Sequence, residues 1–208
     1  IDVRASSDGV IYVLHDPTLR RVGEDPRAVR DLSSAELDQL TLLRGGKPLR
    51  LEQALNLFPT AKFNIDLKVP ETISGVREIL QRMHDSGSNI FNRTLLASFN
   101  DATARTAIKG LPVATSPGIK TVLLAKFGYL IPGLLRWLLA GVDALQIPVK
   151  RAGIRLDSQR FIRAVHACGV EVHYWVINEA AEARRLVRLG ADGIISDRCD
   201  EIAAALAE

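Results

Sequence analysis

The residues of this chain best suited to chemistry are two aspartates, a lysine and a histidine, each in or next to an apolar segment. Asp2 lies in the first apolar segment, His15 follows the second, at residues 11–14, and Asp66 and Lys68 share a third. Carboxylate oxygens are the ligands that hard cations such as Mg²⁺ and Ca²⁺ prefer. An imidazole can transfer protons near neutral pH. These residue types therefore predict metal-assisted or general acid–base chemistry.

The rest of the chain predicts the strands that would position these groups. Short apolar segments alternate with amphipathic ones, a pattern typical of parallel strands joined by helices. With one further strand before residue 1, these strands and helices would form an α/β fold, a (β/α)8 TIM barrel. The barrel would be a single domain over residues 1–208. Catalytic groups in such barrels lie at the carboxyl ends of the strands. An excursion over about residues 5–50 would carry a further strand at residues 10–15. The barrel strands are expected at residues 1–4, 63–68, 94–99, 113–117, 144–149, 171–177 and 193–196.

Helix signals between these strands are local. Ser33 and Glu36 have the spacing of a capping box, in which each side chain satisfies a backbone N–H of the other residue. Asn178 is expected to cap the helix that ends before Gly190. Apolar residues at helical spacing predict buried faces at Val76, Ile79, Leu80 and Met83, at Phe161, Ile162 and Val165, and at Ala183, Leu186 and Val187.

The polar residues of the third segment raise two alternatives. Side chains alternate along a strand, so Asp66 and Lys68 share one face and would both point into the barrel. Polar groups in that position are costly unless they are paired, metal-bound or solvated. The two residues would form either an ion pair that fills the barrel or part of a metal and phosphate site.

Composition limits the partners of the chain. The 27 Lys and Arg residues against 24 Asp and Glu residues give a net charge of +3, without a basic run that would follow a nucleic-acid backbone. This argues against nucleic acid, and a small anionic phosphodiester fits the balance. Cys168 and Cys199 form neither a CxxC pair nor a disulfide framework, which argues against zinc. The sequence leaves the compartment open, with a cytoplasmic or membrane-associated location favoured.

One segment, residues 119–142, is dominated by large apolar residues. A transmembrane helix needs about 20 predominantly apolar residues, but Lys120, Lys126, Pro132 and Arg136 interrupt this one, so we do not expect a span. Three readings stay open. The segment could form two buried helices of the barrel wall, an exposed apolar surface that contacts a membrane or the chain of a lysolipid, or an oligomer contact.

The order of the motifs resembles the glycerophosphodiester phosphodiesterase family along nearly the whole chain. Asp2-Val3, Asp8-Gly9-Val10 and His15-Asp16-Pro17-Thr18-Leu19-Arg20 are similar to the Glu-x-Asp-Val, Asp-Gly and His-Asp-x-x-Leu-x-Arg motifs of that family. Asn64-Ile65-Asp66-Leu67-Lys68 is similar to its Asn-Ile-Glu-hydrophobic-Lys strand, and Ser98-Phe99 to the end of its Ser-Phe strand. Residues 172–178 and 193–198 are similar to its two closing strands.

The resemblance implies metal-dependent hydrolysis of glycerophosphodiesters to glycerol 3-phosphate and an alcohol. Asp2 and Asp66 would bind Mg²⁺ or Ca²⁺, and His15 would be one of two histidines that transfer protons. The residues expected to bind the phosphate or the rest of the substrate are Lys68, Arg20, Ser98 and Trp175.

Two features depart from the family pattern. Its opening His-Arg-Gly strand and the first Glu of Glu-x-Asp should precede Ile1, so this chain alone is expected to hold a cation weakly. Asp66 stands where Glu is usual, and its shorter side chain would bring the cation closer to the strand. The alternatives are a lysophospholipase D-like enzyme, in which residues 119–142 admit a lipid chain, and a barrel without catalysis that serves as a binding or structural module.

Overall fold

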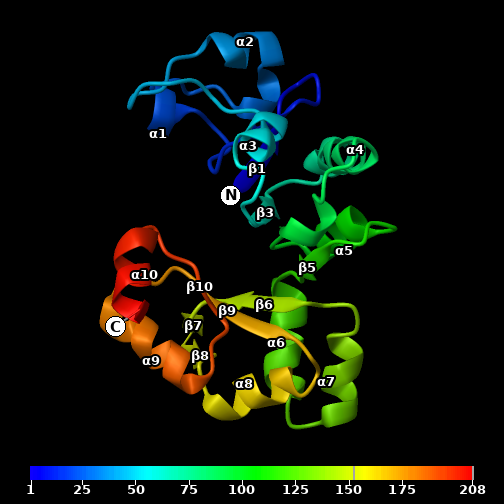
Figure 1. Cartoon of the computed structure of the whole chain (residues 1–208), viewed down its shortest axis with the longest axis vertical. Helices are drawn as coiled ribbons and strands as arrows, with labels where there is room; N and C mark the ends of the chain where they lie inside the picture. Colours follow the sequence, from blue (N-terminus) through cyan, green and yellow to red (C-terminus); the bar gives the residue numbers. More distant parts are fainter. Residues whose placement is uncertain (152, 208) are drawn as a thin grey trace. The chain divides into compact units, whose positions relative to one another are not determined.

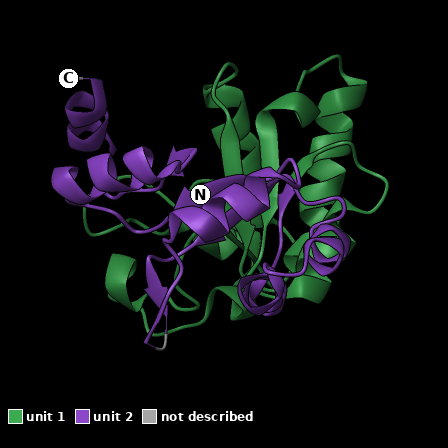
Figure 2. Cartoon of the chain, turned by 90° about the horizontal axis from the view of Figure 1, so that it is seen from below, with its two compact units in different colours: residues 1–114 green, residues 115–208 purple. Residues whose placement is uncertain are grey.

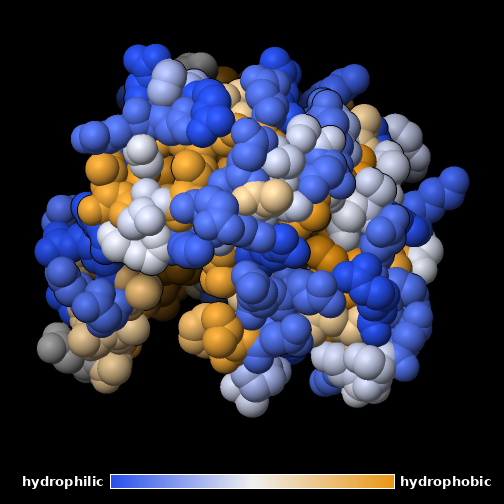
Figure 3. Space-filling view, turned by 90° about the horizontal axis from the view of Figure 1, so that it is seen from above, coloured by the Kyte–Doolittle hydropathy of each residue, from blue (hydrophilic) through white to orange (hydrophobic). Residues whose placement is uncertain are grey.

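The computed structural model describes residues 1–151 and 153–207. The chain divides into two compact units, Ile1–Ala114 and Thr115–Glu208 (Figure 2). Each unit combines strands with helices, as the sequence predicts for the α/β class (Figure 1). On the face drawn in Figure 3, hydrophilic side chains surround smaller apolar areas.

Parallel strands organise the first unit. β1 (Asp2–Ala5) pairs in parallel with β3 (Phe63–Leu67), and β3 pairs in parallel with β4 (Thr94–Ala97). β2 (Ile11–Val13) returns beside β1 and pairs with it in the antiparallel direction. β5 (Ala114–Ser116) is the last strand of the sheet order β2-β1-β3-β4-β5 and lies at the boundary between the units.

Helices of the first unit follow the predicted apolar pattern. α4 (Thr72–Asp85) buries Val76, Ile79, Leu80 and Met83, as predicted. A Cβ on Gly75 of this helix would lie 2.7 Å from Cγ1 of Ile11, so only glycine allows α4 to approach β2 this closely. The other helices are α1 (Arg20–Gly23), η1 (Val29–Asp31), α2 (Ser34–Gln39), α3 (Leu51–Leu57), η2 (Phe91–Arg93) and α5 (Asp101–Ile108).

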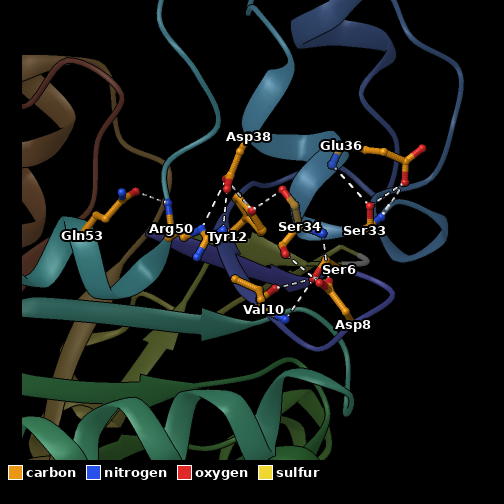
Figure 4. Close-up of polar contacts among 10 residues, drawn as sticks. All are labelled: Ser6, Asp8, Val10, Tyr12, Ser33, Ser34, Glu36, Asp38, Arg50 and Gln53. Atoms are coloured by element: carbon orange, nitrogen blue, oxygen red, sulfur yellow. Dashed lines mark hydrogen bonds and ion pairs between the residues drawn. The ribbon is translucent and has the colours of Figure 1, made fainter.

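The excursion after β1 has an apolar core of its own and a polar framework around it. Asp8 accepts hydrogen bonds from Oγ of Ser6 at 2.6 Å and from N and Oγ of Ser34 at 2.9 and 2.6 Å (Figure 4). These bonds stabilise the charged carboxylate and lower the pKa of Asp8 to about 2. The predicted capping box of Ser33 and Glu36 is confirmed. The core consists of Tyr12, Leu14, Leu19, Val29, Leu32 and Leu37.

A second cluster of polar side chains joins the two ends of the excursion. The hydroxyl of Tyr12 donates to Oδ1 of Asp38 at 2.7 Å, and the guanidinium of Arg50 binds the same carboxylate (Figure 4). Burial and the hydrogen bond to Asp38 raise the pKa of Tyr12 to about 12. This group ties β2 to the residues that lead into α3.

The second unit contains a parallel sheet in the order β10-β9-β6. Its strands are β6 (Ala144–Ile147), β9 (Glu171–Tyr174) and β10 (Gly193–Ile194). A Cβ on Gly193 would lie 2.6 Å from Cδ2 of His173, so glycine is required where these strands meet. A two-residue hairpin, β7 (Lys150–Arg151) and β8 (Ile154–Arg155), was not predicted. The helices are α6 (Ile119–Gly128), α7 (Pro132–Leu138), α8 (Gln159–His166), α9 (Ala180–Leu189) and α10 (Cys199–Ala207).

The structure corrects two local predictions in the second unit. Asn178 does not cap α9, because Glu179 is the N-cap residue and no side-chain cap bond forms there. The Asn178 amide instead accepts from N of Asp197 at 2.9 Å and donates to the carboxylate of that residue. Val187 of α9 is exposed rather than buried, while the predicted buried face of α8 is confirmed.

Residues 119–142 form two short helices, α6 and α7, separated by a turn at residues 129–131. Within the described part of the chain, no helix has both the length and the hydropathy that crossing a bilayer requires.

Candidate active site

The parallel pairing of β1 and β3 brings two predicted site residues together. Asp2 and Asp66 are direct partners in the register of the two strands, and Lys68 follows the end of β3. Nζ of Lys68 lies 2.8 Å from Oδ1 of Asp2 and 2.5 Å from Oδ2 of Asp66. The side chains of Lys68, Asp66 and Asp2 are 14%, 18% and 31% exposed. One ammonium group therefore holds two carboxylates in a largely buried site.

In this cluster a single ammonium group contacts two carboxylates, and the charge of Arg4 also acts on both of them. Burial would lower the pKa of Lys68, but the hydrogen bonds to Asp2 and Asp66 outweigh it and raise that pKa, so the ammonium is charged at neutral pH. Burial raises the pKa of Asp66, and the hydrogen bond from Lys68 offsets only part of that rise. The charge of Asp2 adds to the rise in the pKa of Asp66, because two carboxylates that share one ammonium group repel each other unless a further cation contacts them.

Two oxygens in the same strand lack the partner that burial normally requires. Among the described residues, Oδ1 of Asn64 and Oδ1 of Asp66 are the buried side-chain polar atoms without a hydrogen bond. Asn64 lies two residues before Asp66 and so has the same orientation in β3. Strand alternation already places Asn64 on the face of Asp66 and Lys68, but Asn64 was not predicted as a site residue.

The oxygens of this cluster are of the type that binds Mg²⁺ or Ca²⁺, and the unpartnered Oδ1 of Asp66 could accept such a cation. The carboxylates alone do not complete a coordination sphere. Across residues 1–151 and 153–207, no group of three or more His, Cys, Asp or Glu side chains is arranged to hold a metal ion. Asp2 and Asp66 could supply two ligands of a divalent cation, and amide, water or substrate oxygens would have to supply the others.

His15 lies beyond the end of β2, where the hairpin returns beside β1. The N–H of Leu14 donates to the carbonyl of Asp2 at 3.0 Å, so the backbone places His15 next to the start of β1. Nδ1 of His15 lies 2.7 Å from Oδ1 of Asp16, while the side chain is 60% exposed. Nε2 has no hydrogen-bond partner in the part of the chain that is described, so it can meet a ligand from solvent.

Arg21, which follows the predicted Arg20, contacts Asp16, the hydrogen-bond partner of His15. Nε of Arg21 lies 2.5 Å from Oδ2 of Asp16, and this bond, with the one from His15, lowers the pKa of Asp16 to about 2. Arg20 is exposed at the start of α1. The spacing His-Asp-x-x-Leu-x-Arg places its arginine two residues after Leu19, which corresponds to Arg21. The role of Arg20 stays a prediction.

Arg4 is a second basic residue that sequence reasoning missed. It lies two residues after Asp2 on the same face of β1 and donates from Nε to the carbonyl of His15 at 2.9 Å. Burial lowers the pKa of Arg4, and the nearby carboxylates of Asp16, Asp2 and Asp66 oppose that change. Arg4 therefore bonds the backbone of His15 and interacts through its charge with Asp2 and Asp66.

Ser98 follows β4 and is buried. Its hydroxyl donates to the carbonyl of Leu67 at 2.8 Å and accepts from N of Asn100 at 3.3 Å. The first bond joins the end of β4 to the end of β3, one residue before Lys68, and the second is local to the loop before α5. The contact of Ser98 with a substrate stays a prediction. Phe99 beside it lies with its ring 5.4 Å from Nζ of Lys68.

Trp175 lies in the second unit, directly after β9, and is half-buried. Its backbone N–H donates to the carbonyl of Ile147 at 3.1 Å, which fixes the chain at the end of β6 and β9. This is the carboxyl end of a parallel strand, as predicted. Its role in substrate binding stays a prediction.

The chain matches the Glycerophosphoryl diester phosphodiesterase family over residues 1–201. It is 30% identical to a probable glycerophosphodiester phosphodiesterase 2 of Mycobacterium tuberculosis over 96% of this chain and 75% of that protein. It is 26% identical to human lysophospholipase D GDPD1 over 95% of this chain and 73% of that protein.

Solved structures give the same fold. A phosphodiesterase from Oleispira antarctica, in complex with the product sn-glycerol-3-phosphate, matches with a TM-score of 0.75 and 21% identity over 100% of this chain and 84% of that one. This likeness shows the predicted fold class, α/β of the TIM-barrel kind.

Proposed function

Because this chain belongs to the glycerophosphoryl diester phosphodiesterase family, we propose that it cleaves glycerophosphodiesters to glycerol 3-phosphate and an alcohol. The observation that carries the proposal is the cluster of Asp2, Asp66 and Lys68, in which Asp2 at the start of β1 lies beside the carboxyl end of β3. Barrel enzymes place their catalytic groups at the carboxyl ends of strands, which is where Asp66 and Lys68 lie. The product complex of the Oleispira antarctica phosphodiesterase supports the substrate class.

The charge of the cluster supports a metal-dependent reaction. Two carboxylates would repel a phosphodiester, and Lys68 is already bonded to both of them. We assign Asp2 and Asp66 as ligands of Mg²⁺ or Ca²⁺, with the amide oxygen of Asn64 as a further candidate because it is buried without a partner. Such a cation, when bound, would neutralise charge on a phosphoryl oxygen.

The other residues of the site would position the substrate and transfer protons. Lys68 keeps both carboxylates in place and presents a fixed positive charge to the phosphate. Asp16 accepts from Nδ1 of His15, which leaves Nε2 as the atom that gives or takes a proton. Arg21 holds Asp16 ionised, and Arg4 fixes the backbone of His15.

The experiment is a glycerol phosphate release assay on glycerophosphocholine with the full-length gene product. His15→Ala should lower kcat by about two to four orders of magnitude, because the proton transfer is lost. His166→Ala is the matched control, since His166 also contacts an aspartate, Asp192, at 2.8 Å but lies in α8. EDTA should abolish turnover, and Mg²⁺ or Ca²⁺ should restore it. Equal activity of the two histidine variants would reject the role of His15.

A lysolipid substrate is the second candidate. One relative is named a lysophospholipase D, and large apolar side chains of α6 and α7 are exposed. Comparison of lysophosphatidylcholine with glycerophosphocholine separates the two substrates. Turnover of the lysolipid alone would favour the second candidate, and no turnover of either would favour a binding or structural module.

A further inference from the structure

α6 and α7 form a helical hairpin whose inner side belongs to the core of the second unit. A Cβ on Gly128, the last residue of α6, would lie 3.0 Å from Cδ2 of Leu134 in α7, so the two helices pack closely where they meet. Figure 1 shows the two helices side by side. Side chains on the inner side, including Val122, Ala125 and Leu135, are 2% exposed or less. This side accounts for the predicted buried helices.

The outer side of the same hairpin is also apolar, and it faces water. Trp137 is 74% exposed and Phe127 is 69% exposed. Surface helices of soluble proteins normally carry polar residues on the side away from the core. The hairpin lacks this polar side and instead exposes Leu124, Phe127, Leu130, Ile131, Leu134 and Trp137, which we call the apolar tip.

The charged residues of the hairpin segment itself all have one sign. Residues 118–142 contain Lys120, Lys126 and Arg136 but no Asp or Glu. Lys126 is half-buried, with Nζ 4.9 Å from the centre of the Phe161 ring, and burial lowers its pKa. Arg136 is exposed directly beside Trp137 and can contact a phosphate.

We propose that the apolar tip binds the surface of an anionic phospholipid bilayer. The aromatic side chains would enter the interface between head groups and acyl chains, where an amphipathic ring such as that of Trp is favoured, and Arg136 would meet lipid phosphates. The absence of acidic residues from residues 118–142 reduces the repulsion that an anionic surface would otherwise exert. This inference does not depend on the proposed hydrolysis, because vesicle binding is measured without a substrate.

The test is co-sedimentation of the full-length protein with vesicles of phosphatidylglycerol and phosphatidylcholine, and with vesicles of phosphatidylcholine alone. We expect stronger binding to the anionic vesicles. Phe127→Ser with Trp137→Ser should weaken it by about a hundredfold, since burial of each large apolar side chain contributes about tenfold or more. Arg136→Glu should weaken binding to anionic vesicles by at least about fivefold, because the substitution reverses the charge of the side chain.

Matched controls separate the tip from general surface changes. Leu57→Ser with Phe58→Ser removes two large apolar side chains that are 64% and 57% exposed in the first unit. Arg105→Glu reverses an exposed charge on α5. Both controls should bind vesicles like the wild type, and thermal unfolding should show that all variants are folded. Equal binding by tip variants and controls would overturn the proposal. The proposal would also be overturned if the wild type did not bind vesicles and instead formed a dimer that the tip substitutions dissociate. That result would assign the tip to an oligomer contact.

Discussion

Replacement of Lys68 by Met tests the electrostatic description of the site most directly. Lys68 bonds Asp2 at 2.8 Å and Asp66 at 2.5 Å, and all three side chains are less than a third exposed. Removal of one partner from a buried ion pair leaves an unpaired buried charge and typically costs about 3–5 kcal/mol. The side chain of Asp2 is 31% exposed, so we expect a loss of about 3 kcal/mol, the low end of that range, in the free energy of unfolding at pH 7.

The matched control is Arg82→Met. Nη2 of Arg82 contacts Glu52 at 3.0 Å with both side chains about half exposed, so its loss should change the free energy of unfolding by less than about 1 kcal/mol. Both tryptophans, Trp137 and Trp175, lie in the second unit. Unfolding should therefore be followed by far-UV circular dichroism rather than by tryptophan fluorescence.

The loss in the Lys68→Met variant should depend on pH. Without Lys68, the charge of Asp2 is no longer offset, and the pKa of Asp66, which burial already raises, should rise further. A carboxyl whose pKa is higher in the folded than in the unfolded state binds its proton more tightly when folded. Between the ordinary Asp pKa of about 4 and the raised folded value, stability should increase as the pH falls. The variant should thus be less destabilised at pH 5 than at pH 7.

Divalent cations should also restore part of the lost stability, because a ligand that binds only the folded state stabilises it. Mg²⁺ or Ca²⁺ should raise the Tm of Lys68→Met but have less effect when Asp66→Asn is added. The reasoning would be refuted by a loss no larger than that of Arg82→Met, or by a loss independent of pH.

Two further substitutions test the elements around the site. Asp16→Asn should lower kcat about 10- to 100-fold with little change in KM, because His15 loses the group that orients Nδ1; in a His15→Ala background the same change should have no effect on the rate. Gly75→Ala should lower the free energy of unfolding by about 1–3 kcal/mol, because the new Cβ would overlap Ile11. Gly133 has open space around it, so Gly133→Ala should leave that free energy nearly unchanged. Chemical denaturation measures both variants.

The sequence predicted which segments form strands more accurately than the residues at which those strands end. Each predicted strand exists, but Lys68, Ser98 and Trp175 lie just beyond the observed ends of β3, β4 and β9. Apolar alternation continues through the residues that leave a sheet, so it does not mark where pairing stops. The hairpin of β7 and β8 was missed because two-residue strands carry no periodicity.

The site was predictable as a set of residue types but not as a set of contacts. The motifs indicated Asp2, Asp66 and Lys68, whose mutual bonding depends on the register of β1 and β3, which a single sequence does not specify. Arg4 was missed because its partner is a backbone carbonyl across a hairpin. Asn178 was misread as a helix cap because its amide has a competing partner in Asp197, far along the chain.

The pairing of β1 with β3 also has a consequence for folding kinetics. The whole excursion lies between these strands in the chain, so the two carboxylates can meet only after a long loop has closed, which carries an entropic penalty. The small core around Tyr12 and Leu37 can collapse locally and shorten the effective loop. Substitutions in that core should therefore alter how rapidly the charged cluster assembles during refolding and how often it opens in hydrogen exchange.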